Sequence, residues 1–348
     1  MDPGLFKTFS LIADISRSPA YDPAVGGGPK AMDQAAADGG MPEGKDQAMI
    51  RPTAVLVCGH GSRDVAAIRE FDGLAGALAA RLPHLDVGHA YLEFGRPPIR
   101  DGLDALKARG ARRIVCLPGM LFAAGHVKND IPSEIQAFRR DNPGIEVVYG
   151  RDLGVDPRLI AASAARIEEA EQAAPTPVER KDTLLLVVGR GTRDPDANSN
   201  VAKVARLLWE GMGFGWTEIG FSGVAHPPGD AALAHGARLG YRRIVVFPYF
   251  LFTGVLVRRI YEWADAAAVR FPGVEILKAP YLNDHPLVLA AFLDRLGEAG
   301  RGAVAAGCDL CKYRTPVLGY EDAVGAAQEG HHHHVRGIGV DHDHDPAS

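Results

Sequence analysis

Cysteine is scarce in this chain, which has four among 348 residues. So few cysteines cannot form a disulfide framework for a protein of this length, and we therefore expect a reducing, cytoplasmic environment. Cys58 and Cys116 lie inside apolar runs, so we predict that both are small core residues without a chemical role.

Long apolar runs and an excess of positive charge are also missing. No segment has the roughly 18 uninterrupted apolar residues of a membrane helix, since residues 244–257 are interrupted by Pro248. The start, Met1-Asp2-Pro3, lacks the basic segment of a secretory signal. The formal net charge is −5, whereas nucleic-acid-binding domains are normally basic. We therefore expect neither a membrane nor a nucleic acid among its partners.

Two large enzyme classes lack their motifs. Gly189 and Gly191 follow an apolar run as in a dinucleotide-binding loop, but Asp194 stands where the third glycine belongs, and no Walker loop is present. The G-x-S-x-G pattern of a serine hydrolase is missing around Ser62. These absences argue against both a nucleotide-dependent enzyme and a serine hydrolase.

The middle of the chain contains one pattern twice. Gly-His-Gly-Ser-Arg-Asp at 59–64 returns as Gly-Arg-Gly-Thr-Arg-Asp at 189–194, which is 130 residues later. Arg-Arg-Ile-Val-Cys-Leu-Pro at 112–118 returns at 242–248 with the same spacing of 130. Two copies at this period predict duplicated domains, not a solenoid. The predicted division is a disordered N-terminal extension at 1–51, a first domain at 52–172, a linker at 173–182, a second, degenerate domain at 183–300, and a C-terminal tail at 301–348.

Strands and helices alternate in each copy. Residues 53–58 form a continuous apolar run closed by a glycine, which is typical of a strand buried on both faces. Asp64 is placed to cap the helix that follows. This first strand, further strands at 87–93, 114–121 and 146–149, and intervening helices predict right-handed βαβ units. The predicted fold is therefore two α/β sandwiches, each with a four-stranded parallel sheet, which face each other across a cleft.

Three polar residues of the first copy stand where a parallel sheet binds ligands, beyond the carboxyl ends of its strands. His60 follows the first strand, Glu93 ends the second, and His126 lies in the loop after the third. Two imidazoles and a carboxylate suit a borderline divalent metal, and they suit acid–base catalysis equally well. Taken singly, each has a plainer interpretation as a capping, core or solvated residue. The second copy has Arg190, Gly223 and Thr253-Gly254-Val255 at these places, so the scaffold folds without the three and we favour a functional role.

Residues 59–64, and Leu-Phe-Ala-Ala-Gly-His at 121–126, resemble the motifs of class II chelatases. The resemblance covers residues 53–314 and is strongest to the long-form sirohydrochlorin cobaltochelatases, often called CbiX. It implies insertion of Co²⁺ into sirohydrochlorin, without ATP, on the route to cobalamin. His60 and His126 match the two metal-handling histidines of that family. Glu93 is similar to the assisting acid, although the residues around it match less closely.

The resemblance also implies a substrate with many carboxylates, so the cleft should offer cationic partners. The candidates are one hydroxyl and six basic side chains: Ser62, Arg63, Arg96, Lys128, Arg190, Arg193 and Arg258. Each of the basic residues has the alternative of a solvated surface role. A duplicated chain supplies both walls of the cleft, so a monomer suffices for this function, whereas a cluster shared between two chains would predict a homodimer.

The C-terminal tail contains further candidate metal ligands. Cys308 and Cys311 form a single C-x-x-C, which is half of a tetrahedral zinc site or a cubane cluster. In the long forms that this chain resembles, a C-x-x-C here is associated with an iron–sulfur cluster of the 4Fe-4S type. Ala306 departs from the methionine often found there, and the alternative is a reduced thiol pair without a cofactor. The tail histidines are predicted to store or deliver cobalt or nickel; they are His331, His332, His333, His334, His342 and His344.

Two other functions stay open at this point. The first is insertion of iron, to make sirohaem, or of nickel, because two histidines and a glutamate do not separate these metals from cobalt. The second is a metallochaperone without catalysis, which the tail alone would permit. Binding of a tetrapyrrole would distinguish a chelatase from a chaperone.

Overall fold

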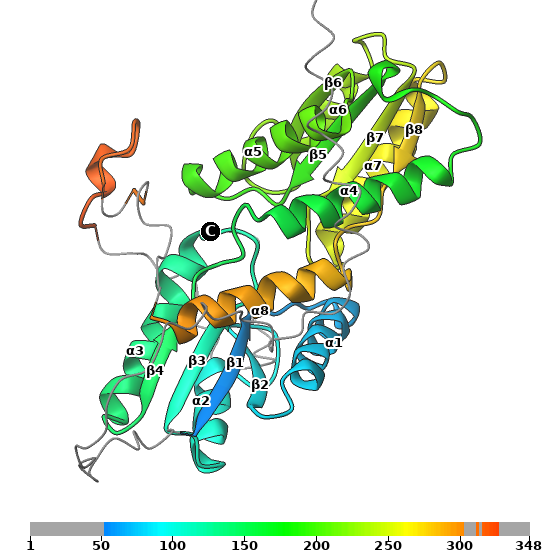
Figure 1. Ribbon diagram of the computed structural model, residues 1–348. Helices are drawn as coiled ribbons and strands as arrows, with labels where there is room; N and C mark the ends of the chain where they lie inside the picture. The colour runs from blue at the N-terminus through cyan, green and yellow to red at the C-terminus, as the bar shows by residue number, and fades with distance from the viewer. Residues whose placement is uncertain (1–51, 303–310, 313–314, 327–348) are drawn as a thin grey trace, which may run out of the picture. The chain divides into compact units, whose positions relative to one another are not determined.

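The computed structural model describes residues 52–302, 311–312 and 315–326 (Figure 1). Its core is formed by two four-stranded sheets, ordered β2-β1-β3-β4 and β6-β5-β7-β8, and all strand pairs are parallel. Both sheets belong to one unit, Ile50–Ser348. The predicted fold of two similar α/β sandwiches is confirmed. None of the described helices is long and apolar enough to cross a membrane.

The first copy contains β1 (Thr53–Gly59), α1 (Val65–Arg81), β2 (Asp86–Tyr91), α2 (Ile99–Ala108), β3 (Arg113–Pro118), the π-helical turn η3 (His126–Asp130), α3 (Ile131–Asp141), β4 (Glu146–Tyr149) and α4 (Pro157–Gln172). The second copy contains the short 3₁₀ turn η4 (Arg180–Asp182), β5 (Thr183–Gly189), α5 (Pro195–Met212), β6 (Trp216–Phe221), α6 (Gly229–Gly236), β7 (Arg243–Pro248), α7 (Val255–Arg270), β8 (Glu275–Lys278) and α8 (Pro286–Gly300), and a 3₁₀ turn, η5 (Glu321–Ala323), follows.

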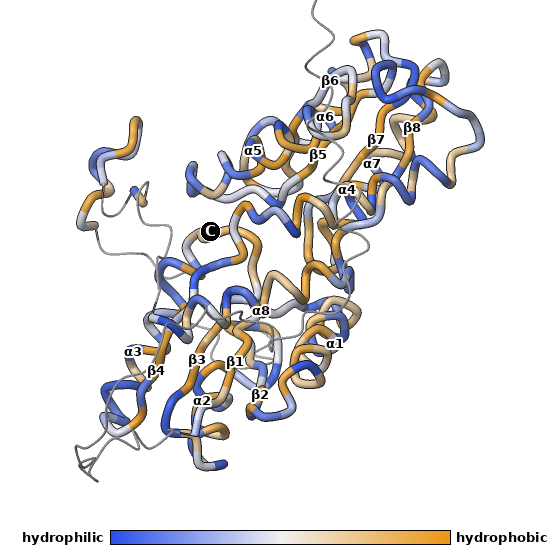
Figure 2. Tube along the Cα trace, viewed as in Figure 1, coloured by the Kyte–Doolittle hydropathy of each residue, from blue (hydrophilic) through white to orange (hydrophobic). Residues whose placement is uncertain are grey.

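The central strands are buried on both faces, as their apolar runs predicted. Every residue of β5 is buried, as is every residue of β1 after the first, and Figure 2 shows these strands as hydrophobic segments. Helices on both sides of a parallel sheet exclude water from both faces, which is why the runs do not alternate with polar residues. Cys58 and Cys116 are 0% exposed, so their predicted place in the core is confirmed.

Two predicted strands end earlier than expected. β2 ends at Tyr91, which pairs with Gly59 at the end of β1, so Glu93 lies in the loop beyond the strand and not at its last position. β3 ends at Pro118, and the amide of the next residue, Gly119, donates the last hydrogen bond to β1, to the carbonyl of Cys58 (2.8 Å). The amide of Glu93 still donates to the carbonyl of His60 (3.0 Å), so the loops after β1 and β2 stay hydrogen-bonded to each other beyond the sheet.

The last helix of each copy packs on the sheet of the other. Leu296 and Ala299 of α8 lie against Val55, Val115 and Leu117 of the first sheet. In turn, α4 contacts α5, β7 and β8 of the second copy. One large hydrophobic cluster consequently includes residues of both copies. The predicted domain limits at 172 and 183 stay a prediction, but packing does not separate the copies there.

Candidate metal centre and cleft

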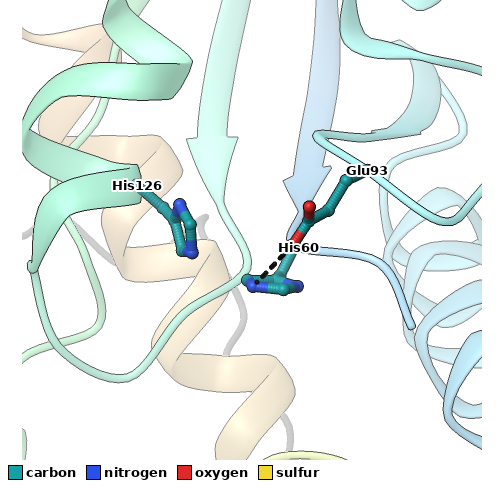
Figure 3. A group of neighbouring side chains, drawn as sticks. All are labelled: His60, Glu93 and His126. Atoms are coloured by element: carbon teal, nitrogen blue, oxygen red, sulfur yellow. Dashed lines mark ion pairs between the residues drawn. The ribbon is translucent and has the colours of Figure 1, made fainter. Parts of the chain in front are cut away.

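Three adjacent strands direct the candidate ligands to one edge of the first sheet. His60 follows β1, Glu93 lies two residues after β2, and His126 begins η3 after β3 (Figure 3). Because the sheet order is β2-β1-β3, the three loops are neighbours at the carboxyl edge. The fold therefore brings together three residues that are up to 66 positions apart in the sequence.

The three side chains converge on one point. One ligand atom from each, His60, Glu93 and His126, lies within 4.8 Å of the others. His60 Nε2 and Glu93 Oε1 are 3.2 Å apart, and the centres of the two imidazole rings are 4.5 Å apart, with an angle of 77° between the ring planes. A metal with bonds of about 2.1 Å takes ligand atoms about 3 to 3.5 Å apart, so small side-chain rotations complete the site.

Each histidine is oriented by an acceptor at Nδ1. The carbonyl of Gly61 lies 2.8 Å from Nδ1 of His60, and Oδ2 of Asp130 lies 2.7 Å from Nδ1 of His126. A carbonyl and a carboxylate can only accept here, so Nδ1 carries the hydrogen in both rings and the lone pair of the neutral imidazole is on Nε2. Both histidines are thereby set to bind a metal through Nε2.

Asp130 is a further candidate residue of the site, which the sequence analysis missed. It lies four residues after His126 within η3, where the wider π-helical turn replaces an ordinary first helical turn. The corresponding segment of the second copy is a regular α-helix that begins at Val255, with Ile260 130 residues after Asp130. The His-x-x-x-Asp spacing, which the second copy lacks, is the signal in the sequence that could have identified it.

Glu93 is held in a low-dielectric position beside the histidines. It is 5% exposed, and this burial raises its pKa, while the electrostatic effects of the neighbouring His126 and Arg190 act in the opposite direction. A buried carboxylate with a raised pKa accepts a proton more readily than one in water. Glu93 is therefore suited both to bind a cation and to take a proton when the cation leaves.

A cavity of about 620 Å³ opens beside the histidines, a volume typical of small-molecule sites. The first copy contributes His60, His126 and the residues around them. The second copy contributes a mostly apolar wall after β7, formed by Tyr249, Phe250, Leu251, Phe252, Thr253, Gly254, Val255, Leu256 and Val257. The cavity thus combines the polar side chains of His60 and His126 with an apolar surface that suits a flat ligand.

Three of the predicted substrate-binding residues line this cavity: Ser62, Arg63 and Arg190. The guanidinium of Arg63 lies 4.7 Å from the centre of the Phe94 ring, which holds it in a cation–π contact. The side chain of Arg190 is accessible from the cavity. The surrounding protein nevertheless removes much of its hydration, which lowers its pKa, and the charge of Glu93 partly offsets this effect. Ser62 Oγ accepts from the amide of Asp64 (3.0 Å) and so shapes the loop.

The other four predicted substrate-binding residues do not belong to the described cavity lining. Arg96 and Arg193 are exposed outside it. Arg258 pairs with Asp64 (2.5 Å), and Lys128 pairs with Asp194 (2.7 Å) and with Asp196. Burial disfavours the charge of Lys128, but the two carboxylates outweigh it and the pKa of this amine is raised.

The predicted metal ligands of the tail fall mostly on residues that the structure does not describe. These are Cys308 and the six histidines of 331–344. Cys311 is described and is 2% exposed, and the amine of the next residue, Lys312, donates to the carbonyl of Arg193 (3.4 Å). The cluster and the metal-storage role stay predictions.

Two oriented imidazoles and a buried carboxylate beside a cavity with apolar lining fit one class of protein, the chelatases. The comparisons with known proteins agree. The CbiX family model matches residues 54–170 and 184–299, one match for each copy. The chain belongs to the CbiX family, which confirms the resemblance of its two motifs.

Individual relatives give the same result. The chain is 36% identical to the sirohydrochlorin cobaltochelatase of Priestia megaterium over 274 residues, which cover 77% of this chain and 87% of the relative. It is 34% identical to the sirohydrochlorin ferrochelatase of the same organism over 237 residues, 67% and 85% of the two chains. Among solved structures, SirB from Bacillus subtilis with Fe³⁺ has a TM-score of 0.64 at 28% identity and covers 72% of this chain and 96% of that chain.

Proposed function

We propose that this chelatase inserts Co²⁺ into sirohydrochlorin without ATP, in the cytoplasm, as a step toward cobalamin. The observation that carries the proposal is the convergence of His60, Glu93 and His126 at the edge of a cavity with an apolar opposite wall. The similarity to a cobaltochelatase over 87% of its length supports the same substrate.

The three ligands fit the demands of metal insertion. The divalent metal first binds to Nε2 of His60, Nε2 of His126 and a carboxylate oxygen of Glu93. As it passes to the macrocycle, two pyrrole nitrogens each lose a proton, so two protons must be taken up for each metal inserted. The release of the metal returns the imidazole lone pairs and the Glu93 carboxylate, which are the acceptors nearest to the departing protons.

The rest of the cavity is proposed to bind the macrocycle. The apolar wall after β7, including Leu251 and Phe252, can stack against the ring. The acidic side chains of sirohydrochlorin would then meet Arg63 and Arg190, which line the same cavity. A cleft with walls from both copies needs no second chain, which supports a monomer as the catalytic form.

Cobalt is proposed over iron on two grounds. The cobaltochelatase of Priestia megaterium is similar over more of this chain than the ferrochelatase is, 77% against 67%. The histidines at 331–334 also suit cobalt or nickel delivery. Iron or nickel insertion is the outcome that would replace this part of the proposal while leaving the chelatase chemistry intact.

The test is an optical assay. Purified protein is mixed with sirohydrochlorin and Co²⁺ in the absence of ATP, and the absorbance change of metal insertion is followed against a protein-free control. Parallel reactions with Fe²⁺ and Ni²⁺ rank the metals. We expect acceleration with Co²⁺, and we expect His126→Ala and His60→Ala to abolish it without loss of the fold.

The matched control is His235→Ala. His235 also pairs with a glutamate, Glu218 (3.2 Å), but it lies on α6 and outside the cavity lining. Its replacement should leave the rate unchanged. If both active-site variants keep near-normal turnover, the site is wrongly assigned. If folded protein binds metal but neither binds sirohydrochlorin nor accelerates insertion, the protein is a metal carrier.

A further inference from the structure

Two ion pairs join the first copy to the second at positions related by the duplication. Lys128 Nζ lies 2.7 Å from Asp194 Oδ2, and Arg258 Nη1 lies 2.5 Å from Asp64 Oδ2. The two basic residues are 130 positions apart, and so are the two aspartates. Each aspartate also caps the helix after it, through Oδ1, at α1 and at α5. The duplicated scaffold therefore contains this type of ion pair twice. In one pair the basic residue belongs to the first copy and the aspartate to the second, and in the other pair the reverse holds.

The two pairs differ sharply in burial. The side chains of Lys128 and Asp194 are each 5% exposed, and Asp196 provides a second carboxylate 3.1 Å from the amine. Arg258 is 52% exposed and Asp64 is 12% exposed. A surface pair in water tolerates wide side-chain movement, whereas charges removed from water must keep close contact with their partners. Only the Lys128 pair can act as a rigid connection.

Lys128 is part of the turn that presents His126. It lies two residues after His126 in η3, and its amide donates to the carbonyl of Ala124 (2.8 Å) just before that histidine. Arg258 stands at the same place in α7, but Leu256 replaces the histidine there. The buried pair is thus found on the copy that carries a metal ligand, and the exposed pair on the copy that does not.

We propose that Lys128 is a positioning residue for the metal centre. Its buried ion pair with Asp194 fixes the His126 turn to the start of α5, and this contact sets where His126 stands relative to His60 and Glu93. The sequence had placed Lys128 among the substrate-binding residues, but its amine is engaged by two carboxylates of the second copy. The inference rests on the proposed role of the three ligands in metal binding.

Calorimetric titration with Co²⁺ tests the proposal without the tetrapyrrole. All variants are full-length and carry asparagine in place of the tail histidines, so that metal bound by the tail does not contribute. Lys128→Met should raise the Co²⁺ dissociation constant about tenfold to a hundredfold, the range found for groups that orient metal ligands. In the optical assay, it should raise KM for the metal and leave KM for sirohydrochlorin unchanged.

The control for loss of a lysine ion pair is Lys278→Met. Lys278 pairs with Asp265 (2.6 Å) on β8 and α7, and both side chains are largely exposed. The Co²⁺ dissociation constant of the Lys278→Met variant should stay within about twofold of the parent value, as expected for an exposed pair outside the site. An equal effect of the two lysine variants would overturn the proposal.

A second variant separates positioning from stability. Lys128→Met leaves a buried carboxylate without its cation, and the added change Asp194→Asn removes that charge while keeping a good helix cap. We expect the double variant to recover thermal stability but not Co²⁺ affinity. Recovery of both would show a purely structural role and overturn the proposal.

Two further outcomes are distinguishable. If Lys128→Met does not fold, Asp194→Asn replaces it, because this change removes the charge that the proposal pairs with Lys128 and keeps a good helix cap. A dissociation constant raised about threefold or more supports positioning, and an unchanged one overturns it. If the parent itself binds no Co²⁺ that His126→Ala removes, the proposed function fails, and not the role of Lys128 alone.

Discussion

Gly61 provides the sharpest test of how the loops after β1 and β2 are fitted together. Its φ is +91°, and a Cβ atom placed on it would lie 1.6 Å from the carbonyl oxygen of Glu93. Cβ atoms essentially never approach other heavy atoms within 3.0 Å, so Gly61→Ala must move the backbone of residue 61 or of Glu93 by more than 1 Å. The carbonyl of Gly61 itself fixes Nδ1 of His60, so both sides of the His60–Glu93 contact are affected.

The magnitude follows from two contributions. An alanine with positive φ costs about 1–2 kcal/mol, and forcing a group into a packed site costs about 1–3 kcal/mol more. We therefore expect the free energy of unfolding to fall by about 2–5 kcal/mol. A displacement of about 1 Å at reacting groups lowers turnover about a hundredfold.

Gly110→Ala is the matched control. Gly110 has a similar φ of +100°, but no heavy atom lies within 4 Å of the added Cβ. This variant should show only the backbone cost of about 1–2 kcal/mol, with unchanged turnover. Urea unfolding and the optical insertion assay measure both quantities. If Gly61→Ala loses no more stability than Gly110→Ala and inserts metal at the normal rate, the contact between the loops does not matter as argued.

Three further changes test other parts of the molecule. Asp130→Ala should raise the Co²⁺ dissociation constant about tenfold to a hundredfold, because His126 loses the acceptor that fixes its tautomer, and an unchanged value in calorimetry would contradict this role. Burial raises the pKa of Asp152 from 3.8 to about 6, so the folded state binds this proton more tightly than the unfolded state and loses stability as pH rises through that window. Asp152→Asn keeps an acceptor for the amide of Ala123 and should stabilise the protein by about 1–3 kcal/mol near pH 8 but not below about pH 4; equal urea midpoints of variant and parent near pH 8 would refute the sign. Replacing His331–His334 should leave turnover at saturating metal nearly unchanged, and a large loss there would place the tail in catalysis.

The sequence by itself determined the architecture and singled out the main candidate ligands. Buried parallel strands require continuous apolar runs, so β1 and β5 were visible in the composition of short segments. The spacing of 130 residues showed the duplication, and the comparison of its copies singled out His60, Glu93 and His126. These features are local or repetitive, and a linear sequence displays both kinds directly.

Only the tertiary structure decided which polar groups meet. The exact ends of β2 and β3 depend on partner strands, which is why Glu93 was placed on a strand that stops at Tyr91. The placement of α4 and α8, each of which packs on the other copy, depends on contacts between the two copies. The basic residues looked alike in sequence, yet Arg63 lines the cavity while Lys128 is buried against Asp194, 66 positions away. A charged side chain takes the partner that the folded backbone brings within reach, and no local pattern encodes that approach.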